Sequence, residues 1–176
     1  DGAFTFAFLP AEASIYAIRF LPGQQVVFIA APGDTIRVSG DLSDFPASFL
    51  VEGNIETDLL QSFYSYSESN LRKVDSLQRL IDLNQGSADF YALTVRVDSL
   101  LNLIWEAQRQ YEKAFLREHA GTLASLLVVN YHFGMKPLLS PEADRSDYRR
   151  VDSGLRAAYP NNRHTLLFHR WLQEVR

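Results

Sequence analysis

The hydrophobic pattern of this chain changes its period near residue 53, and no other feature restricts the fold as strongly. Before that point apolar residues alternate with polar or small ones, which is typical of strands with one buried face. From Asn54 onward apolar residues recur every three or four positions, as on one face of a helix. The sequence therefore predicts an α+β protein, with an antiparallel β-subdomain at 1–53 and a helical subdomain at 54–176.

Short segments of the first part have strand character and are separated by turn residues. The turns include Pro22-Gly23 and Pro32-Gly33-Asp34, and they recur at intervals of roughly ten residues. This spacing favours an antiparallel meander or sandwich of about five strands. The expected strands are 4–8, where Phe4, Phe6 and Phe8 alternate with small residues, then 15–20, 25–30, 35–39 and 48–52.

The second part predicts about five helices. Two long amphipathic segments cover 54–119 and are joined only by a short link at Gly86, which favours an antiparallel pair. Three shorter helices are expected after them. Their start signals are Gly121-Thr122, Ser140 followed by Pro141, and Asn162 or His164, and the last helix reaches Arg176.

The composition excludes several classes of function. The 176 residues carry a net charge of -4 and no run of Lys and Arg, so the basic stripe of a nucleic-acid-binding protein is missing. There is no cysteine, which removes disulfides, thiolate metal sites and cysteine nucleophiles from this chain. No apolar segment approaches the roughly 20 residues needed to cross a bilayer.

Patterns for catalysis and metal binding are also lacking in the sequence. The four histidines, His119, His132, His164 and His169, do not have the spacing of three or four residues that places two ligands on one helix face. No phosphate-binding glycine loop and no serine-nucleophile motif occurs. Asp34 stands in a turn, where Asp is favoured for local hydrogen bonding. We therefore expect no catalytic residue, no cofactor and no metal site in this chain.

The two long segments carry a group of aromatic residues that has two interpretations. Phe63, Tyr64 and Tyr66 lie on the first segment, and Trp105 and Tyr111 lie on the second. Aromatic side chains on facing helices usually form core, whereas an exposed part of such a face would be a recognition or dimer patch. The core interpretation is favoured, because exposed apolar patches are the exception.

Several short motifs follow one another in an order that resembles a known family. They are DGAFTF at 1–6, IYAIRF at 15–20, VVFIAAPGDTIRVSGD at 26–41 and FLVEGNIETDLL at 49–60. Together they resemble the domain of unknown function 4369 family, which has DGxFxF, a tyrosine-containing strand, and PGD before a strand that ends in glycine. The stretch 119–175, with its PLLSPE loop, is similar to the helical region of that family.

The resemblance implies a role for the chain. Members of this family precede thioredoxin-like domains in envelope proteins of anaerobic gut-type bacteria, so the chain is expected to be a non-catalytic accessory region of a thiol-disulfide oxidoreductase. Its expected partners are the C-terminal thioredoxin-like domain of the same polypeptide, substrate proteins and a second copy of the chain. The expected location is the periplasm or cell envelope, with an upstream lipid anchor as the only membrane contact. The alternative is a free-standing periplasmic binding module for peptide or glycan.

A homodimer has two candidate surfaces in the sequence. One is the unpaired edge of the expected strand at 4–8, and the other is the helical face that carries the aromatic group. The helical face is favoured, because aromatic-rich patches dominate interface energetics while edge pairing risks open-ended aggregation.

Overall fold

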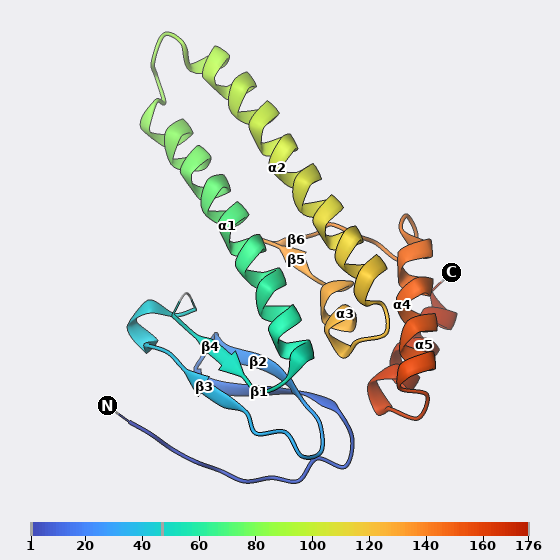
Figure 1. The fold of residues 1–176 in the computed structure, drawn as a ribbon. Coiled ribbons are helices and arrows are strands. Elements are labelled where there is room, and N and C mark those ends of the chain that lie inside the picture. The colour runs from blue at the N-terminus through green and yellow to red at the C-terminus, as the bar shows by residue number, and fades with distance from the viewer. Residues whose placement is uncertain (1, 47, 176) are drawn as a thin grey trace.

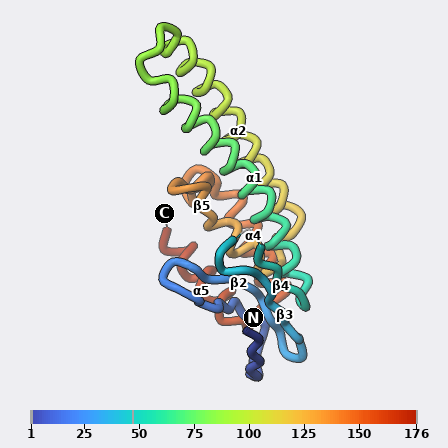
Figure 2. Tube along the Cα trace, turned by 90° about the vertical axis from the view of Figure 1, so that its left-hand side faces the viewer, coloured from blue at the N-terminus to red at the C-terminus, as the bar shows by residue number. Residues whose placement is uncertain are grey.

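The computed structural model describes residues 2–46 and 48–175, and helices dominate it. A long antiparallel pair, α1 (Ile55–Leu83) and α2 (Phe90–His119), rises from a base as a helical arm (Figure 1). The base holds the small sheets and the three shorter helices, which are α3 (Leu123–Val128), α4 (Arg145–Ala158) and α5 (Arg163–Glu174). Figure 2 shows the distal ends of both arm helices standing clear of the other elements. Within the described ranges no helix is both long and apolar enough to cross a membrane.

The described residues form three separate antiparallel sheets of two strands each. The predicted five-stranded meander or sandwich is therefore wrong, and the protein is mostly helical with small sheets. The pairs are β1 (Ser14–Leu21) with β2 (Gln24–Ala30), β3 (Arg37–Ser39) with β4 (Leu50–Glu52), and β5 (His132–Phe133) with β6 (Lys136–Pro137).

Two side chains of α1 account for the separation of the first two sheets. The hydroxyl of Thr57 donates a hydrogen bond to the carbonyl of Ile29 in β2 at 2.9 Å and accepts one from its N–H at 2.8 Å. One turn later, the amide of Gln61 accepts from the N–H of Val51 in β4 at 2.8 Å and also donates to its carbonyl. A larger sheet would need these same backbone groups for strand pairing. The helix occupies the outer edges of β2 and β4.

The predicted strand at 4–8 is also wrong. The side chains of Phe4, Phe6 and Phe8 are exposed, and none of the backbone hydrogen bonds found among the described residues involves residues 2–10. Alternation of apolar and small residues indicates an extended backbone, but it does not supply the neighbouring strand that completes a sheet.

The main hydrophobic core lies among the helices. Ile29 of β2 joins it, and so does Leu60 of α1; both are almost inaccessible to solvent. A smaller core lies between the first two sheets and contains Val26, Phe28, Ala30 and Val51.

A buried carboxylate links three elements at the base. Glu56, in the first turn of α1, accepts a hydrogen bond from the N–H of Leu123 at 2.6 Å and another from the hydroxyl of Tyr159 at 2.5 Å. These two donors lie at the start of α3 and just after α4. The Glu56 side chain gives both of them a hydrogen-bond acceptor, which they would otherwise lack inside the protein. It therefore holds the root of the arm to the shorter helices.

Helix starts follow the capping residues in most cases. Asn54 accepts hydrogen bonds from two N–H groups in the first turn of α1, and Thr122 accepts one in the first turn of α3, as the sequence predicts. The fourth helix starts at Arg145, later than expected. The hydroxyl of Ser140 accepts from the N–H of Ala143, which makes a separate turn ahead of the helix.

Candidate functional site

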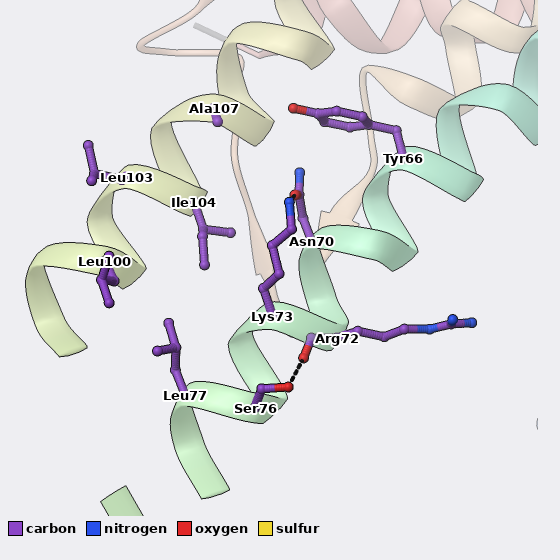
Figure 3. Close-up of a pocket in the computed structure, with 10 residues that line it drawn as sticks. All are labelled: Tyr66, Asn70, Arg72, Lys73, Ser76, Leu77, Leu100, Leu103, Ile104 and Ala107. Carbon is purple, nitrogen blue, oxygen red and sulfur yellow. Dashed lines mark hydrogen bonds between the residues drawn. The ribbon is translucent and has the colours of Figure 1, made fainter. Parts of the chain in front are cut away.

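The clearest candidate surface is a groove of about 620 Å³ between α1 and α2 (Figure 3). Leucines 100 and 103 of α2 line one side and remain exposed, with 67% of Leu103 accessible to solvent. The other side is formed by α1, where Tyr66, Asn70 and Lys73 lie above Leu77. The groove is therefore apolar along α2 and mixed along α1.

A chain of hydrogen bonds forms the polar end of this groove. The ammonium of Lys73 donates to Asn70 Oδ1 at 2.8 Å, and Asn70 Nδ2 donates to Gln108 Oε1 at 3.0 Å across the two helices. Gln108 Nε2 in turn donates to Ser67 Oγ at 2.7 Å. Asn70, Gln108 and Ser67 are buried, so their amides and hydroxyl are satisfied within the protein. An ammonium has three donors, which leaves Lys73 able to bind an acidic group beside the exposed leucines.

The five aromatic residues singled out in the sequence divide into two groups. Phe63 is fully buried and makes ring contacts with Tyr64 and Tyr111, at centroid distances of 6.0 and 5.7 Å. Tyr66 stacks on Tyr111 at 3.9 Å and reaches the groove, where it is exposed. Trp105 lies apart from them, against Phe133 of β5 at 5.2 Å. Within this set, Tyr66 is the residue that both lines the groove and is exposed.

A second polar cluster, which is partly buried, lies between α2 and the start of α4. Asp144 accepts hydrogen bonds from Arg109 Nη2 at 2.5 Å and from Lys113 Nζ at 2.6 Å, and Lys113 also reaches Asp147 at 3.0 Å. Burial alone would raise the pKa of Asp144, but the hydrogen bonds from Lys113 and from the Ser140 N–H hold it below its ordinary value. This cluster holds the two helices together.

Glu112 lies next to that cluster and has no hydrogen-bond partner among the described residues, although it is fully buried. Burial raises the pKa of its carboxyl to about 8, the nearby carboxylate of Asp144 adds to the rise, and Arg109 and Lys113 oppose it. A neutral carboxylic acid avoids the larger penalty of a buried unpaired charge. The raised pKa favours the protonated form of Glu112 in the folded protein at neutral pH.

The histidines occupy four different environments. Ser14 Oγ lies 2.8 Å from Nε2 of His164, and His169 Nδ1 lies 2.9 Å from Asp152 Oδ1. His119 packs on Phe115, and His132 of β5 contacts the carbonyl of Asn130 just before the strand. Across residues 2–46 and 48–175 there is no group of three or more side chains that could hold a metal ion.

The exposed leucines of the groove are the site residues that sequence reasoning missed. Apolar residues at 100, 101, 103, 104 and 105 cover more of the helix circumference than a single contact with α1 requires. Such a broad stripe on a helix of a two-helix hairpin is the signal that could have identified them, since one neighbouring helix covers only part of it.

The chain has no match among protein-family models, curated proteins or solved structures.

Proposed function

We propose that this chain is a non-catalytic accessory module of an envelope thiol-disulfide oxidoreductase, and that its helical arm recognises the protein substrates of a thioredoxin-like domain. The observation that carries the proposal is the groove on the arm, where exposed leucines lie beside Lys73 on helices that project from the base. The motif order of the chain, which resembles the domain of unknown function 4369 family, supports the link to a redox domain.

The chemistry of the groove suits an unfolded or partly folded polypeptide. Leu100 and Leu103 offer apolar contact area, and Lys73 offers a cation to an acidic side chain. Apolar residues that line a groove beside polar ones give an apolar segment a surface to pack on. A substrate protein held on the arm would have its disulfide presented to the redox domain. This chain has no cysteine, so the thiol exchange itself must come from that domain.

The complete coding sequence provides the first test. A thioredoxin-like domain with a Cys-x-x-Cys motif is expected to follow residue 176, and an export signal is expected to direct the protein to the envelope. A complete gene that encodes neither would contradict the proposal and would favour the alternative of a free-standing peptide-binding module.

A kinetic test then separates recognition from chemistry in the whole protein. Leu100→Glu combined with Leu103→Glu should lower kcat/KM for reduction of a protein disulfide by about ten-fold or more, which corresponds to about 1.4 kcal/mol. Reduction of a small aromatic disulfide should not change, because a small substrate does not need the arm. The matched control is Leu166→Glu with Leu167→Glu, a half-exposed pair on α5. The proposal would be contradicted if kcat/KM fell equally for both substrates, or fell equally in both double variants.

A further inference from the structure

The first residues of the chain carry a row of aromatic rings that continues into the first sheet. Ring centroids of Phe4, Phe6 and Phe8 follow one another at 6.1 and 6.0 Å, and Phe8 lies 4.9 Å from Tyr16 of β1. Alternate residues of an extended chain are spaced by roughly 6.6 Å. The segment therefore has the geometry of a strand, and it runs along the bottom of the base (Figure 1).

Within the described part of the chain the backbone of this segment is unpaired, and its aromatic face is only partly covered, by the contact of Phe8 with Tyr16. No described backbone hydrogen bond involves residues 2–10, and 56% of Phe6 is accessible to solvent. A hollow of about 250 Å³ lies beside the row, with Phe6, Phe8 and Ile18 among its lining residues. Free N–H and C=O groups next to exposed rings are what a further strand pairs with.

The sequence of the segment is nearly the same in both directions. It reads Phe-Thr-Phe-Ala-Phe over residues 4–8. If two copies pair antiparallel about Phe6, then Phe6 faces Phe6 of the second copy, Phe4 faces Phe8, and Thr5 faces Ala7. All the rings then lie on one face of the pair. Residues 2–10 carry no charged side chain, so the pairing places no like charges opposite one another.

We propose that residues 3–9 of two copies of this chain pair as antiparallel strands around a two-fold axis at Phe6, which makes the protein a homodimer. A two-fold contact uses the same surface on both copies and closes on itself, so a dimer forms rather than an open fibre. The proposal is independent of the function proposed for the arm, since the arm is not part of this interface.

The first experiment uses charge at the axis. Sedimentation of the 176-residue chain across micromolar concentrations should show a dimer. Phe6→Glu and Phe6→Lys should each weaken dimerisation by more than about ten-fold, because each places two like charges directly opposite one another. An equimolar mixture of the two variants should dimerise again. Met135→Glu is the control, because Met135 is exposed and lies outside the paired segment.

The second experiment uses the absence of cysteine in the chain. Phe6→Cys should give a disulfide-linked dimer on mild oxidation, since directly opposite residues have Cβ atoms about 4.5–5.5 Å apart. Thr5→Cys should not, because two copies of residue 5 lie diagonally across the pair, at about 7 Å or more.

Several results would overturn the proposal. A chain that stays monomeric throughout the concentration range would do so, as would a dimer that survives both charged variants or a mixture that fails to dimerise. Cross-linking through residue 5 as readily as through residue 6 would place the contact in another register. Circular dichroism should show unchanged helix content in every variant, since Phe6 lies outside both cores.

Discussion

Thr57 of α1 holds both backbone groups of Ile29 in β2, donating to its carbonyl at 2.9 Å and accepting from its N–H at 2.8 Å. The hydroxyl thereby acts in the place of a neighbouring strand. Both residues are buried, so neither backbone group has water as an alternative partner. This pair fixes the position of the first sheet against the root of the arm.

Thr57→Val should destabilise the protein by about 2–4 kcal/mol, because it keeps the shape of the side chain and leaves two buried backbone groups unpaired. Thr57→Ser keeps the hydroxyl and removes one methyl, so the free energy of unfolding should fall by about 1 kcal/mol or less. Urea denaturation followed by circular dichroism measures both values. Equal losses for the two variants would show that packing, and not the hydrogen bonds, is what Thr57 contributes.

Gly154→Ala should destabilise the protein, although Gly to Ala within a helix ordinarily stabilises by about 1 kcal/mol. A Cβ on Gly154 would lie 2.5 Å from both the carbonyl carbon and the oxygen of Ala120, so α4 would have to move away from the end of α2. This overpacking should lower the free energy of unfolding by about 1–3 kcal/mol. Ser153→Ala, at the exposed neighbouring position of α4, is the control and should be neutral or slightly stabilising. A gain in stability from Gly154→Ala would contradict the packing described here.

Phe63→Ala should lower the free energy of unfolding by about 3–5 kcal/mol, because this ring is fully buried at the centre of an aromatic cluster. Tyr91→Ala, on the exposed face of the arm, should change stability by less than about 0.5 kcal/mol. Thermal and chemical denaturation both report these differences. A small effect at Phe63 would place that residue at a surface and not in the core.

Glu112 should make the protein less stable as pH rises from about 4.5 to about 8. The carboxyl has its ordinary pKa of 4.5 in the unfolded chain, whereas burial raises the folded-state pKa to about 8. Between these values the folded state binds the proton and the unfolded state does not, so the free energy of unfolding falls with pH, by at most about 1.4 kcal/mol per pH unit. Glu112→Gln removes the titrating group. Denaturation of both proteins at several pH values should show a flatter dependence for the variant, and parallel curves would rule out this role for Glu112.

His164 should produce a loss of stability in acid. Its Nε2 lies 2.8 Å from Ser14 Oγ and accepts from the N–H of Ile15 at 3.5 Å, which requires a neutral ring. Burial lowers the pKa of His164 below its ordinary value of 6.5, against an opposing effect of Glu12. The unfolded chain therefore takes up this proton first, and the free energy of unfolding falls as pH drops below 6.5.

The comparison of pH 7.5 with pH 5 tests this expectation. His164→Gln should lose less stability than the wild type between the two values, whereas His132→Gln, at an exposed position of β5, should behave like the wild type. Identical losses in all three proteins would assign the acid sensitivity to other groups.

The helical part of the protein was predictable in outline because its signals are local. Spacings of three and four residues identified both arm helices, and Asn54 and Thr122 marked helix starts through hydrogen bonds to N–H groups two or three residues away. The strands β1 and β2 were predictable for the same reason, since alternation and the intervening turn are contained in one short stretch. Among the aromatic residues, the favoured core interpretation fits Phe63, while Tyr66 lies at the groove.

What the sequence by itself determined is the set of segments that become helical or extended, because backbone preference and amphipathic period depend on near neighbours. The tertiary structure decided how those segments use their edges and faces. Thr57 and Gln61 take the strand edges that a sandwich would have needed. Glu112 is buried without a hydrogen-bond partner among the described residues, and Leu103 is left on an open face. Each of these outcomes depends on which distant residue lies within a few ångströms, and hydrogen bonding and desolvation act only at that range.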